Sequence, residues 1–370
     1  MADSFTFLEF FAGGGMARLG LGPRWRCLFA NDLDPVKRAA YGENFGLDHH
    51  HVGDIHALSL ADLPAGTADL AWASSPCQDL SLAGARRGLG AARSGAFFGF
   101  WRLIEALDAE ARAPRMIVVE NVVGLLTSNR GADFAALAER FAARGYFVSA
   151  AILNAADFIP QSRPRLFIIA ARADLIGSPL AAAAPAALKA AVERLSPAAR
   201  ARWRWIGARP RPVRTEALAD ILDDGAAFDP PPRTRALLAA MAPSQRAALQ
   251  SLRRSGGRHV GAGFRRVRVE DGHKRVRFEA RFDGLAGCIR TPAGGSSRQI
   301  IIAIDDGRVR TRLMTAREAA RAMGLPDDYA LPAGATAALK LIGDGVAPPV
   351  VRWLADTLLE PALGGLRRAA

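Results

Sequence analysis

The sequence predicts an α/β fold in which a mostly parallel β-sheet carries helices on both faces, together with a smaller second lobe. Over residues 1–171, short apolar runs alternate with helical patterns, as a parallel sheet flanked by helices requires. A glycine-rich turn follows the first of these runs, at the position where such sheets bind ligands. Beyond residue 171 the chain becomes rich in Ala and Pro and then strictly alternating, which predicts the separate lobe.

The individual elements follow from local patterns. The helix after Asp34 has favourable start chemistry, because Asp34 can cap it and Pro35 suits its first turn. Further helices are predicted over Ser94–Ala111, Asp133–Arg144 and Thr315–Met323. The predicted strands are Phe5–Phe10, Trp25–Ala30, Ala68–Ala73, Arg115–Val119, Tyr146–Leu153 and Arg165–Ala170.

Composition limits the class of protein. The chain has 370 residues, with no apolar run of about 18 residues that could span a bilayer and no basic segment before its first apolar run. Its three cysteines are widely separated, which argues against a disulfide framework or a zinc cluster and fits a reducing cytoplasm. We therefore expect a cytoplasmic protein without metal and without a membrane partner.

The charge balance points to a polyanionic partner. Lys and Arg total 49 against 36 Asp and Glu, a net charge of +13, and nearly all of the excess is arginine. A solvated basic surface is the alternative. Within FRRVRVEDGHKRVRFEARF the alternation around Asp271-Gly272 predicts a β-hairpin. One of its faces would carry valines and phenylalanines, and the other would carry Arg266, Arg268, Arg275, Arg277 and Arg281.

Three successive strand ends offer groups suited to a nucleoside. The turn FFAGGGMARLGLG misses the dinucleotide spacing because Met16 and Leu19 intrude, so a pyrophosphate is a poorer candidate than a nucleoside with a smaller tail. Asp32 ends the second strand, where ribose hydroxyls are usually held, and a third strand region ends at Gly53-Asp54-Ile55, a plausible adenine contact. With no phosphate-binding lysine, this series favours S-adenosylmethionine over NAD or ATP.

The next strand ends supply reactive groups. Cys77 lies in SSPCQDLSLAG at the carboxyl end of a strand, and Glu120 ends the neighbouring strand in VVENVVGL. A cysteine beside a carboxyl group makes a nucleophile with an acid next to it, whereas a small buried hydrophobe is the alternative for Cys77. In QSRPRLFIIA the residues Arg163 and Arg165 point the same way if this is a strand, which suits an anionic or carbonyl-bearing ligand; ion pairs on a strand edge are the alternative.

The run His49, His50 and His51 invites a metal interpretation. Consecutive residues of an extended segment cannot converge on one ion, so a solvated loop is predicted instead.

The motifs FAGGG, NDLD, GDI, SSPCQDLS, ENV, QSRPR and TAREAARAMGLPDDY, in this order, resemble those of the DNA (cytosine-5) methyltransferase family of bacterial or phage type. The resemblance covers both ends of the chain and leaves roughly 172–285 unmatched. It implies an S-adenosylmethionine-dependent methyltransferase (Rossmann-like) sheet and a variable target-recognition lobe. The implied domains are 1–171 for catalysis and cofactor binding, 172–312 for target recognition, and 313–370 for C-terminal helices that return to the catalytic domain.

The resemblance also implies a mechanism. Cys77 attacks carbon 6 of a flipped cytosine while Glu120 holds ring nitrogen 3, and carbon 5 takes the methyl group of S-adenosylmethionine. Arg165 holds the base carbonyl, and Arg163 and Gln161 order the site.

The implied cofactor site surrounds the glycine-rich turn. Phe11 would stack near the adenine, Asp32 would hold the ribose, and Asp54 would reach the adenine. The chain departs from the family pattern at Met16, which replaces a glycine, at Asp32, which replaces the commoner Glu, and at GDGV, which replaces GN(S/A)V. The implied cofactor contacts are Phe11, Ala12, Gly13, Gly15, Asp32, Leu33, Asp54, Ile55, Pro76, Asp344 and Val346.

Double-stranded DNA is the implied partner, and the basic hairpin is the expected reader because a two-stranded ribbon fits the major groove. A solvated hairpin face is the alternative. One chain holds every required group, so we expect a monomer; a cognate restriction endonuclease would act separately, unless this is an orphan or phage enzyme. The expected DNA contacts are Gln78, Ser81, Arg266, Arg268, Arg275, Arg277, Thr291 and Arg298.

Three other functions fit the sequence less well. An RNA cytosine-5 methyltransferase would need little or no variable lobe, and this lobe exceeds 100 residues. A catalytically silent DNA-binding protein should have lost Cys77 or Glu120, and both are present. A nicotinamide oxidoreductase is disfavoured by the missing G-x-G-x-x-G spacing.

Overall fold

The computed structural model divides the chain into two compact units. It describes residues 4–75, 95–173, 184–207, 209–270, 272–291 and 298–369. The first unit is formed by Met1–Leu153, Pro164–Arg211 and Val350–Ala370, and the second by Asn154–Arg163 and Pro212–Pro349. The predicted division into catalytic and target-recognition domains stays a prediction.

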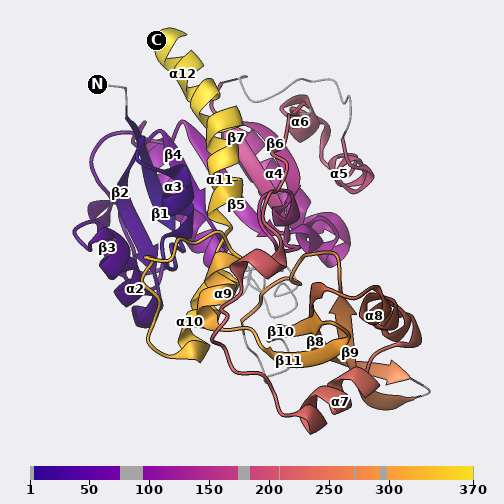
Figure 1. Cartoon of the computed structure of the whole chain (residues 1–370). Coiled ribbons are helices and arrows are strands. Elements are labelled where there is room, and N and C mark those ends of the chain that lie inside the picture. Colours follow the sequence, from indigo (N-terminus) through magenta and orange to yellow (C-terminus); the bar gives the residue numbers. More distant parts are fainter. Residues whose placement is uncertain are drawn as a thin grey trace. The chain divides into compact units, whose positions relative to one another are not determined.

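A seven-stranded sheet forms the centre of the first unit, in the order β3-β2-β1-β4-β5-β7-β6 (Figure 1). The five strands from β3 to β5 pair in parallel, and β7 pairs antiparallel to β5. The expected mostly parallel sheet is thus confirmed. The strands are β1 (Phe5–Phe10), β2 (Trp25–Asp32), β3 (His50–Val52), β4 (Leu70–Ala73), β5 (Met116–Val122), β6 (Phe147–Asn154) and β7 (Pro164–Ala171).

Helices cover both faces of this sheet. Leu8 and Phe10 of β1 pack with α3 and α4 in one large apolar core. Alternate residues of a strand face opposite sides, so Phe5 and its ring partner Trp25 lie on the other face, where the Trp25 indole donates to Glu360 of α12. The helices of this unit are α1 (Met16–Leu21), α2 (Pro35–Phe45), α3 (Ala96–Ala109), α4 (Ala132–Ala143), α5 (Ala186–Val192), α6 (Pro197–Ala201), α11 (Pro348–Leu354, which begins in the second unit) and α12 (Glu360–Ala369).

The predicted start of α2 is confirmed. The Asp34 carboxylate accepts the Val36 amide N–H at 2.9 Å, and Pro35 occupies the first helical position. Such a cap contributes about 1 kcal/mol. Because the cap fixes where α2 begins, it also fixes the turn that leaves the end of β2.

The predicted histidine loop is wrong. His50 begins the strand β3 and is only 7% exposed, with both ring nitrogens buried and without a hydrogen-bond partner. Its ring packs edge-on against Tyr41 at 4.7 Å. Burial lowers the pKa of His50 to about 4, so the side chain is neutral and serves the apolar packing.

The second unit is built on a four-stranded antiparallel sheet, in the order β11-β10-β8-β9. Met241 and Leu249, from the α7–α8 region, pack on Phe278 and the isoleucines of β10 to form its core. The strands are β8 (Arg258–Glu270), β9 (His273–Arg281), β10 (Ile300–Asp305) and β11 (Arg308–Leu313); the helices are α7 (Pro231–Ala239), α8 (Pro243–Ser255), α9 (Ala316–Arg321) and α10 (Ala335–Asp344).

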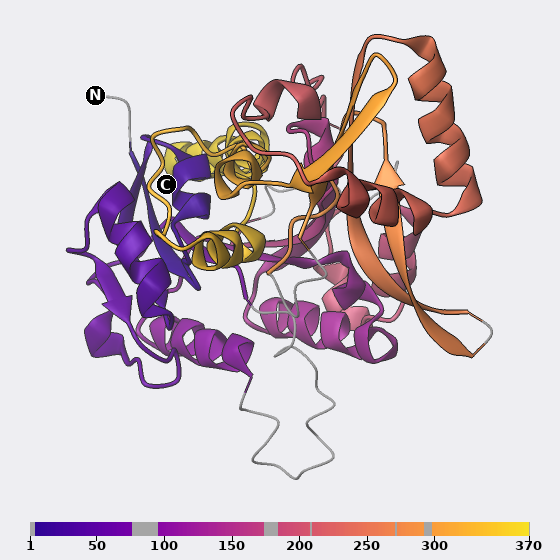
Figure 2. The ribbon, with the colours of Figure 1, turned by 60° about the horizontal axis from the view of Figure 1, so that its bottom comes forward.

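The predicted hairpin is confirmed as β8 and β9. Val267 lies opposite Val276 on one face, and Arg266 lies opposite Arg277 on the other. The valine face is not wholly apolar, because it also carries Arg265, opposite Phe278, and Lys274, opposite Val269. The strands are joined through residues 271–272, of which 271 lies outside the described residues, and Gly272 has a φ of 78°. Only the first half of β8 also pairs with β10, and the paired ends of β8 and β9 run on beyond the rest of the sheet (Figure 2).

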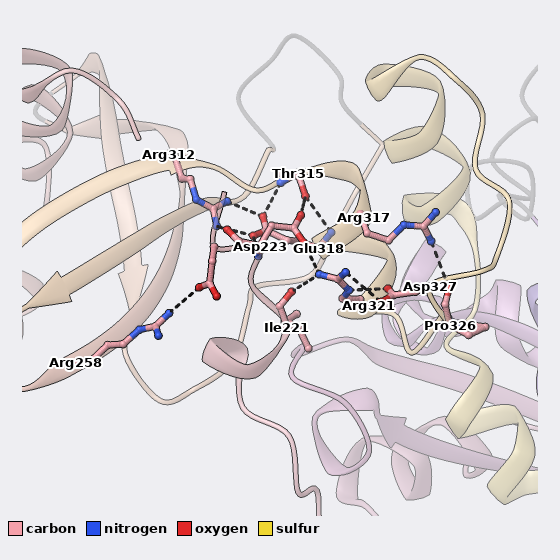
Figure 3. A network of polar contacts seen from close by, with 11 residues as sticks. Ile221, Asp223, Arg258, Arg312, Thr315, Arg317, Glu318, Arg321, Pro326 and Asp327 are labelled. Atoms are coloured by element: carbon pink, nitrogen blue, oxygen red, sulfur yellow. Dashed lines mark hydrogen bonds and ion pairs between the residues drawn. The ribbon is translucent and has the colours of Figure 1, made fainter. Parts of the chain in front are cut away.

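A network of charged side chains fastens this sheet to α9 within the second unit (Figure 3). Arg312, on β11, forms a buried two-point ion pair with Glu318, one branch of which is 2.7 Å long. Glu318 also completes a capping box with Thr315, and Arg321 pairs with Asp223. Losing one partner of such a buried pair typically lowers the free energy of unfolding by about 3–5 kcal/mol. The Arg312–Glu318 pair is therefore expected to hold α9 firmly against the sheet.

No helix among the described residues is long and apolar enough to cross a membrane.

Candidate functional site

The loop after β1 adopts a backbone shape suited to a close ligand approach. Phe11, Gly13 and Gly15 all have positive φ angles, of 57°, 56° and 78°. Such an angle is rare for a bulky residue such as Phe11 and costs on the order of 1–3 kcal/mol, which points to a functional constraint. A side chain at Gly13 would meet nothing within 4 Å, so open space borders the loop there.

Asp32 links this loop to the end of β2. Its carboxylate accepts the Gly13 amide at 2.8 Å and the Asp34 amide at 2.9 Å. Each carboxylate oxygen can accept a second hydrogen bond, so Asp32 keeps capacity for ligand hydroxyls. Asn31 extends the link to β3 by donating to the carbonyls of His51 and Gly53, both at 3.1 Å.

The remaining predicted cofactor residues of the first unit line the same strand ends. Ala12 donates to the Asn31 carbonyl at 2.9 Å. Leu33 is 68% exposed, and Asp54 is exposed with its carboxylate accepting the His56 amide at 2.9 Å. Ile55 is buried in the core. Among the predicted cofactor residues of this unit, Gly13 and Asp32 are joined directly, by the hydrogen bond from the Gly13 amide to the Asp32 carboxylate.

The strand that leads to the predicted nucleophile is tied to β5. The Asn121 side chain donates to the Ser75 carbonyl at 3.0 Å, and the Ser74 amide donates to the Phe10 carbonyl at 3.4 Å. Residues 76–94 lie outside the described residues, and with them the predicted Pro76, Cys77, Gln78 and Ser81. The anchoring role of Asn121 was missed, although its place in ENV was the signal for it.

Glu120, one residue before Asn121, pairs with Arg165 on the adjacent strand. Antiparallel pairing sets Val122 opposite Arg165, and the Arg165 Nε lies 3.1 Å from the Glu120 Oε1. The two side chains are only 16% and 8% exposed. A charge this buried requires a partner, so the guanidinium both compensates and orients the carboxylate.

Arg163 and Gln161 organise loops of the second unit. Arg163 is 2% exposed and donates to the carbonyls of Ile289 at 2.8 Å, Gly343 at 2.8 Å and Gly345 at 2.6 Å. Gln161 accepts the Ile289 amide at 3.0 Å and donates to the Ala322 carbonyl at 2.8 Å. These bonds commit much of the Arg163 guanidinium to backbone carbonyls. That the two residues order a catalytic site stays a prediction.

Two residues predicted for different ligands contact each other. The Thr291 hydroxyl donates to the Asp344 carboxylate, although Thr291 was expected at DNA and Asp344 at the cofactor. The backbones approach closely here, because a side chain at Gly343 would lie 2.5 Å from the Thr291 nitrogen. Val346, the other predicted cofactor residue of this loop, is buried. Arg298, predicted at DNA, is half-buried.

A buried acid close to the glycine-rich loop was also missed. Glu9, on β1, is 1% exposed; its Oε1 accepts the Arg18 amide at 3.4 Å, and its Oε2 has no hydrogen-bond partner. Burial raises the pKa of Glu9 to about 8, against the opposing charge of Arg18. Its signal in the sequence was a carboxylate inside the apolar run FTFLEFF.

Among the described residues, no group of three or more His, Cys, Asp or Glu side chains is placed to hold a metal ion.

Comparisons with known proteins agree on one family. Residues 5–360 match the family described as C-5 cytosine-specific DNA methylase. The type II methyltransferase M.HpaII of Haemophilus parainfluenzae is 27% identical over 386 residues, which cover 99% of this chain and 92% of that protein. M.BsuFI of Bacillus subtilis is 33% identical over 172 residues, which cover 46% of this chain and 40% of that protein.

Solved structures show the same fold. A methyltransferase of Entamoeba histolytica, EhMeth, superposes with a TM-score of 0.64 at 14% identity, covering 98% of this chain and 99% of that chain. The Dnmt2 methyltransferase of S. pombe gives a TM-score of 0.58 at 18% identity, covering 96% and 99%.

Proposed function

This chain belongs to the C-5 cytosine-specific DNA methylase family, and we propose that it methylates carbon 5 of a cytosine in duplex DNA with Cys77 as the nucleophile. The observation that carries the proposal is the pairing of Glu120 with Arg165 directly beside Asn121. Asn121 holds Ser75, two residues before Cys77. A carboxyl group oriented by a cation thus lies beside the residue that holds Ser75, from which the sequence runs on to Cys77.

The chemistry requires a covalent route because carbon 5 of cytosine is a poor nucleophile. The base must first leave the duplex, at a cost of a few kcal/mol. The Cys77 thiolate then forms a bond to carbon 6, and Glu120 holds ring nitrogen 3 so that the electron pair reaches carbon 5. After carbon 5 has gained the methyl group, loss of its proton expels the thiolate and restores the aromatic ring.

The residues around the glycine-rich loop fit S-adenosylmethionine. Bound there, it supplies a methyl group on a positively charged sulfur. Asp32 would accept the ribose hydroxyls with its remaining lone pairs, and the half-buried Phe11 would stack on the adenine. Leu33 and Asp54 extend this site at the next strand ends, and Asp344 and Val346 are proposed to complete it.

The β8–β9 hairpin is the proposed DNA reader. Val267, Val269 and Val276 are exposed on one face, where they can meet apolar base edges such as the thymine methyl group. Arg275 on the other face is exposed, with no ion pair to a described carboxylate. Arg266, Arg268 and Arg277 share that face and pair with Glu279 or Glu270.

Methyl transfer to unmethylated genomic DNA tests the proposal. Purified protein with S-adenosylmethionine is expected to label DNA, and bisulfite sequencing of the product should show protected cytosines in one sequence context. Cys77→Ala should lower the rate at least 1,000-fold, because the covalent route is lost. Cys27→Ala is the matched control, since Cys27 is buried and its pKa is raised by burial to about 12. Full activity of Cys77→Ala would refute the mechanism.

Restriction-modification is the proposed setting, because M.HpaII and M.BsuFI are named type II methyltransferases. A cognate endonuclease would act as a separate protein on the same sequence. DNA from cells that express the gene should then resist an endonuclease of matching specificity.

A further inference from the structure

One stretch of the first unit concentrates positive charge without any acidic residue. Residues 194–211, called here the arginine segment, contain six arginines and no Asp or Glu, against a net charge of +13 for the whole chain. Residue 208 of this segment lies outside the described residues. A local excess of this size is expected to create a strong positive potential at the protein surface.

The arginine segment follows the outer edge of the seven-stranded sheet. Trp203 pairs in parallel with Val148 of β6, the edge strand: the Val148 amide donates to the Arg202 carbonyl at 2.9 Å, and the Arg204 amide donates to the Val148 carbonyl at 2.7 Å. Figure 1 shows α6, the helix within this segment, beside β6. Further along, the Trp353 indole donates to the Pro210 carbonyl at 2.9 Å. Hydrogen bonds therefore hold the segment to β6 around Trp203 and to α11 at Pro210.

Several of these arginines have no ion pair with a carboxylate in the described part of the chain. Arg200 and Arg209 are exposed, and neither has an ion pair to a described carboxylate. The Arg202 guanidinium donates to the Gly145 carbonyl at 2.8 Å and lies over the Phe147 ring, and neither of these contacts involves a carboxylate. Arg172, also in the first unit, pairs instead with Asp108. The arginine segment therefore offers charge to an external partner.

The aromatic residues of the segment face inward. Trp203 is buried and contacts the Phe134 ring at 6.0 Å, and Trp205 contacts Trp203 at 5.5 Å and packs against the same core. Single-stranded nucleic acids are usually held by aromatic side chains on which unpaired bases stack. With its tryptophans turned inward, the segment suits the phosphate backbone of a duplex better than unpaired bases.

We propose that the arginine segment is a second DNA-binding surface, which holds the phosphate backbone of duplex DNA without reading its sequence. The proposal rests on the duplex DNA substrate of the proposed function and adds a site outside the hairpin and the catalytic residues. Such contacts release counterions from DNA, strengthen non-specific binding and raise the rate of encounter.

The test measures binding of the full chain to a mixed-sequence duplex over a series of salt concentrations, by fluorescence anisotropy. The double variant Arg200→Gln/Arg209→Gln removes two exposed charges that have no described intramolecular partner. We expect the slope of log binding constant against log salt to fall in magnitude by about 1–2, since each phosphate contact contributes about 0.9. The KM for genomic DNA should rise while kcat stays unchanged, because neither residue belongs to the catalytic or cofactor site.

Two controls isolate the charge and its position. Arg200→Lys/Arg209→Lys keeps both charges and should keep the slope. Arg26→Gln removes an exposed charge from β2, elsewhere on the same sheet, and should leave the slope unchanged. A wild-type slope for the double glutamine variant would overturn the proposal, as would an equal loss for Arg26→Gln or a loss seen only with structured RNA. The binding slope needs no methyl transfer, so it stays decisive even if the proposed catalytic mechanism fails.

Discussion

Glu9, a single residue near the glycine-rich loop, makes the stability of the fold depend on pH. Its side chain is fully buried, one carboxyl oxygen has no partner, and burial raises its pKa to about 8. The unfolded chain releases the Glu9 proton near pH 4.5, whereas the folded chain keeps it up to about pH 8. The contribution of Glu9 to stability is thus fully present below pH 4.5 and is lost as the pH rises through 8.

The variant Glu9→Gln should remove this loss, because an amide keeps the shape of the protonated acid and does not titrate. We expect the wild type to lose stability relative to the variant as the pH rises from 5 to 9, by on the order of 4 kcal/mol at the upper end. Chemical unfolding at a series of pH values measures the difference. Parallel stability curves for the two proteins would show that Glu9 is ionised in the fold.

At the same scale, contacts between residues of the recognised motifs were easier to predict than contacts elsewhere. Glu120 and Arg165 lie in motifs whose residue types belong to one chemistry, and the structure places them 3.1 Å apart. The contact between Thr291 and Asp344 joins positions 53 residues apart, in segments that carry no shared pattern. Such a contact depends on the packing of the second unit, which local spacing does not encode.

The hairpin is the element whose charge pattern bears most directly on DNA binding. Its register matches the alternation of valines and arginines in the sequence. The sequence did not reveal which arginines are neutralised: Arg277 pairs with Glu270, with one branch of 2.8 Å, whereas Arg275 has no ion pair to a described carboxylate. The hydrogen bond from Arg277 lowers the pKa of Glu270 in this half-buried pair.

Matched single variants follow from this difference. Arg275→Gln should lower the salt slope of DNA binding by about 1, because it removes a free phosphate-binding charge. Arg277→Gln should lower it less, since Glu270 already balances part of that charge. Binding titrations over a series of salt concentrations compare the two. A larger effect for Arg277→Gln would mean that DNA displaces Glu270, and no effect for either would remove the hairpin from the interface.

Other elements were predictable to different degrees. Strands β1 and β2 are long apolar runs next to turn residues, and the prediction located both. Strand β3 has only three residues, His50–Val52, and it exists because the parallel neighbour β2 pairs with it. A polar edge strand of this kind is stabilised by pairing rather than by its own hydrophobic pattern, which is why the sequence indicated a loop.

For the whole molecule, the sequence was sufficient to identify the family, because seven motifs occur in the family order along the chain. The strand order β3-β2-β1-β4-β5-β7-β6 explains why motifs distant in sequence meet: β1, β4 and β5 are neighbours whose carboxyl ends share one edge. The residues proposed for the cofactor lie at or just after the ends of β1 to β3. The residues proposed for base chemistry lie after β4, on β5 and on β7. The proposed methyl-transfer mechanism depends on the covalent role of Cys77.

Covalent trapping tests that claim most directly. In duplex DNA whose cytosines carry fluorine in place of the carbon 5 hydrogen, the final loss of that hydrogen cannot occur, so the thiolate should remain bonded to carbon 6. With S-adenosylmethionine present, we predict a stable protein–DNA adduct that peptide mass spectrometry maps to Cys77. An adduct at Cys27 or Cys288, or methylation of ordinary DNA without any adduct on the fluorinated duplex, would contradict the account.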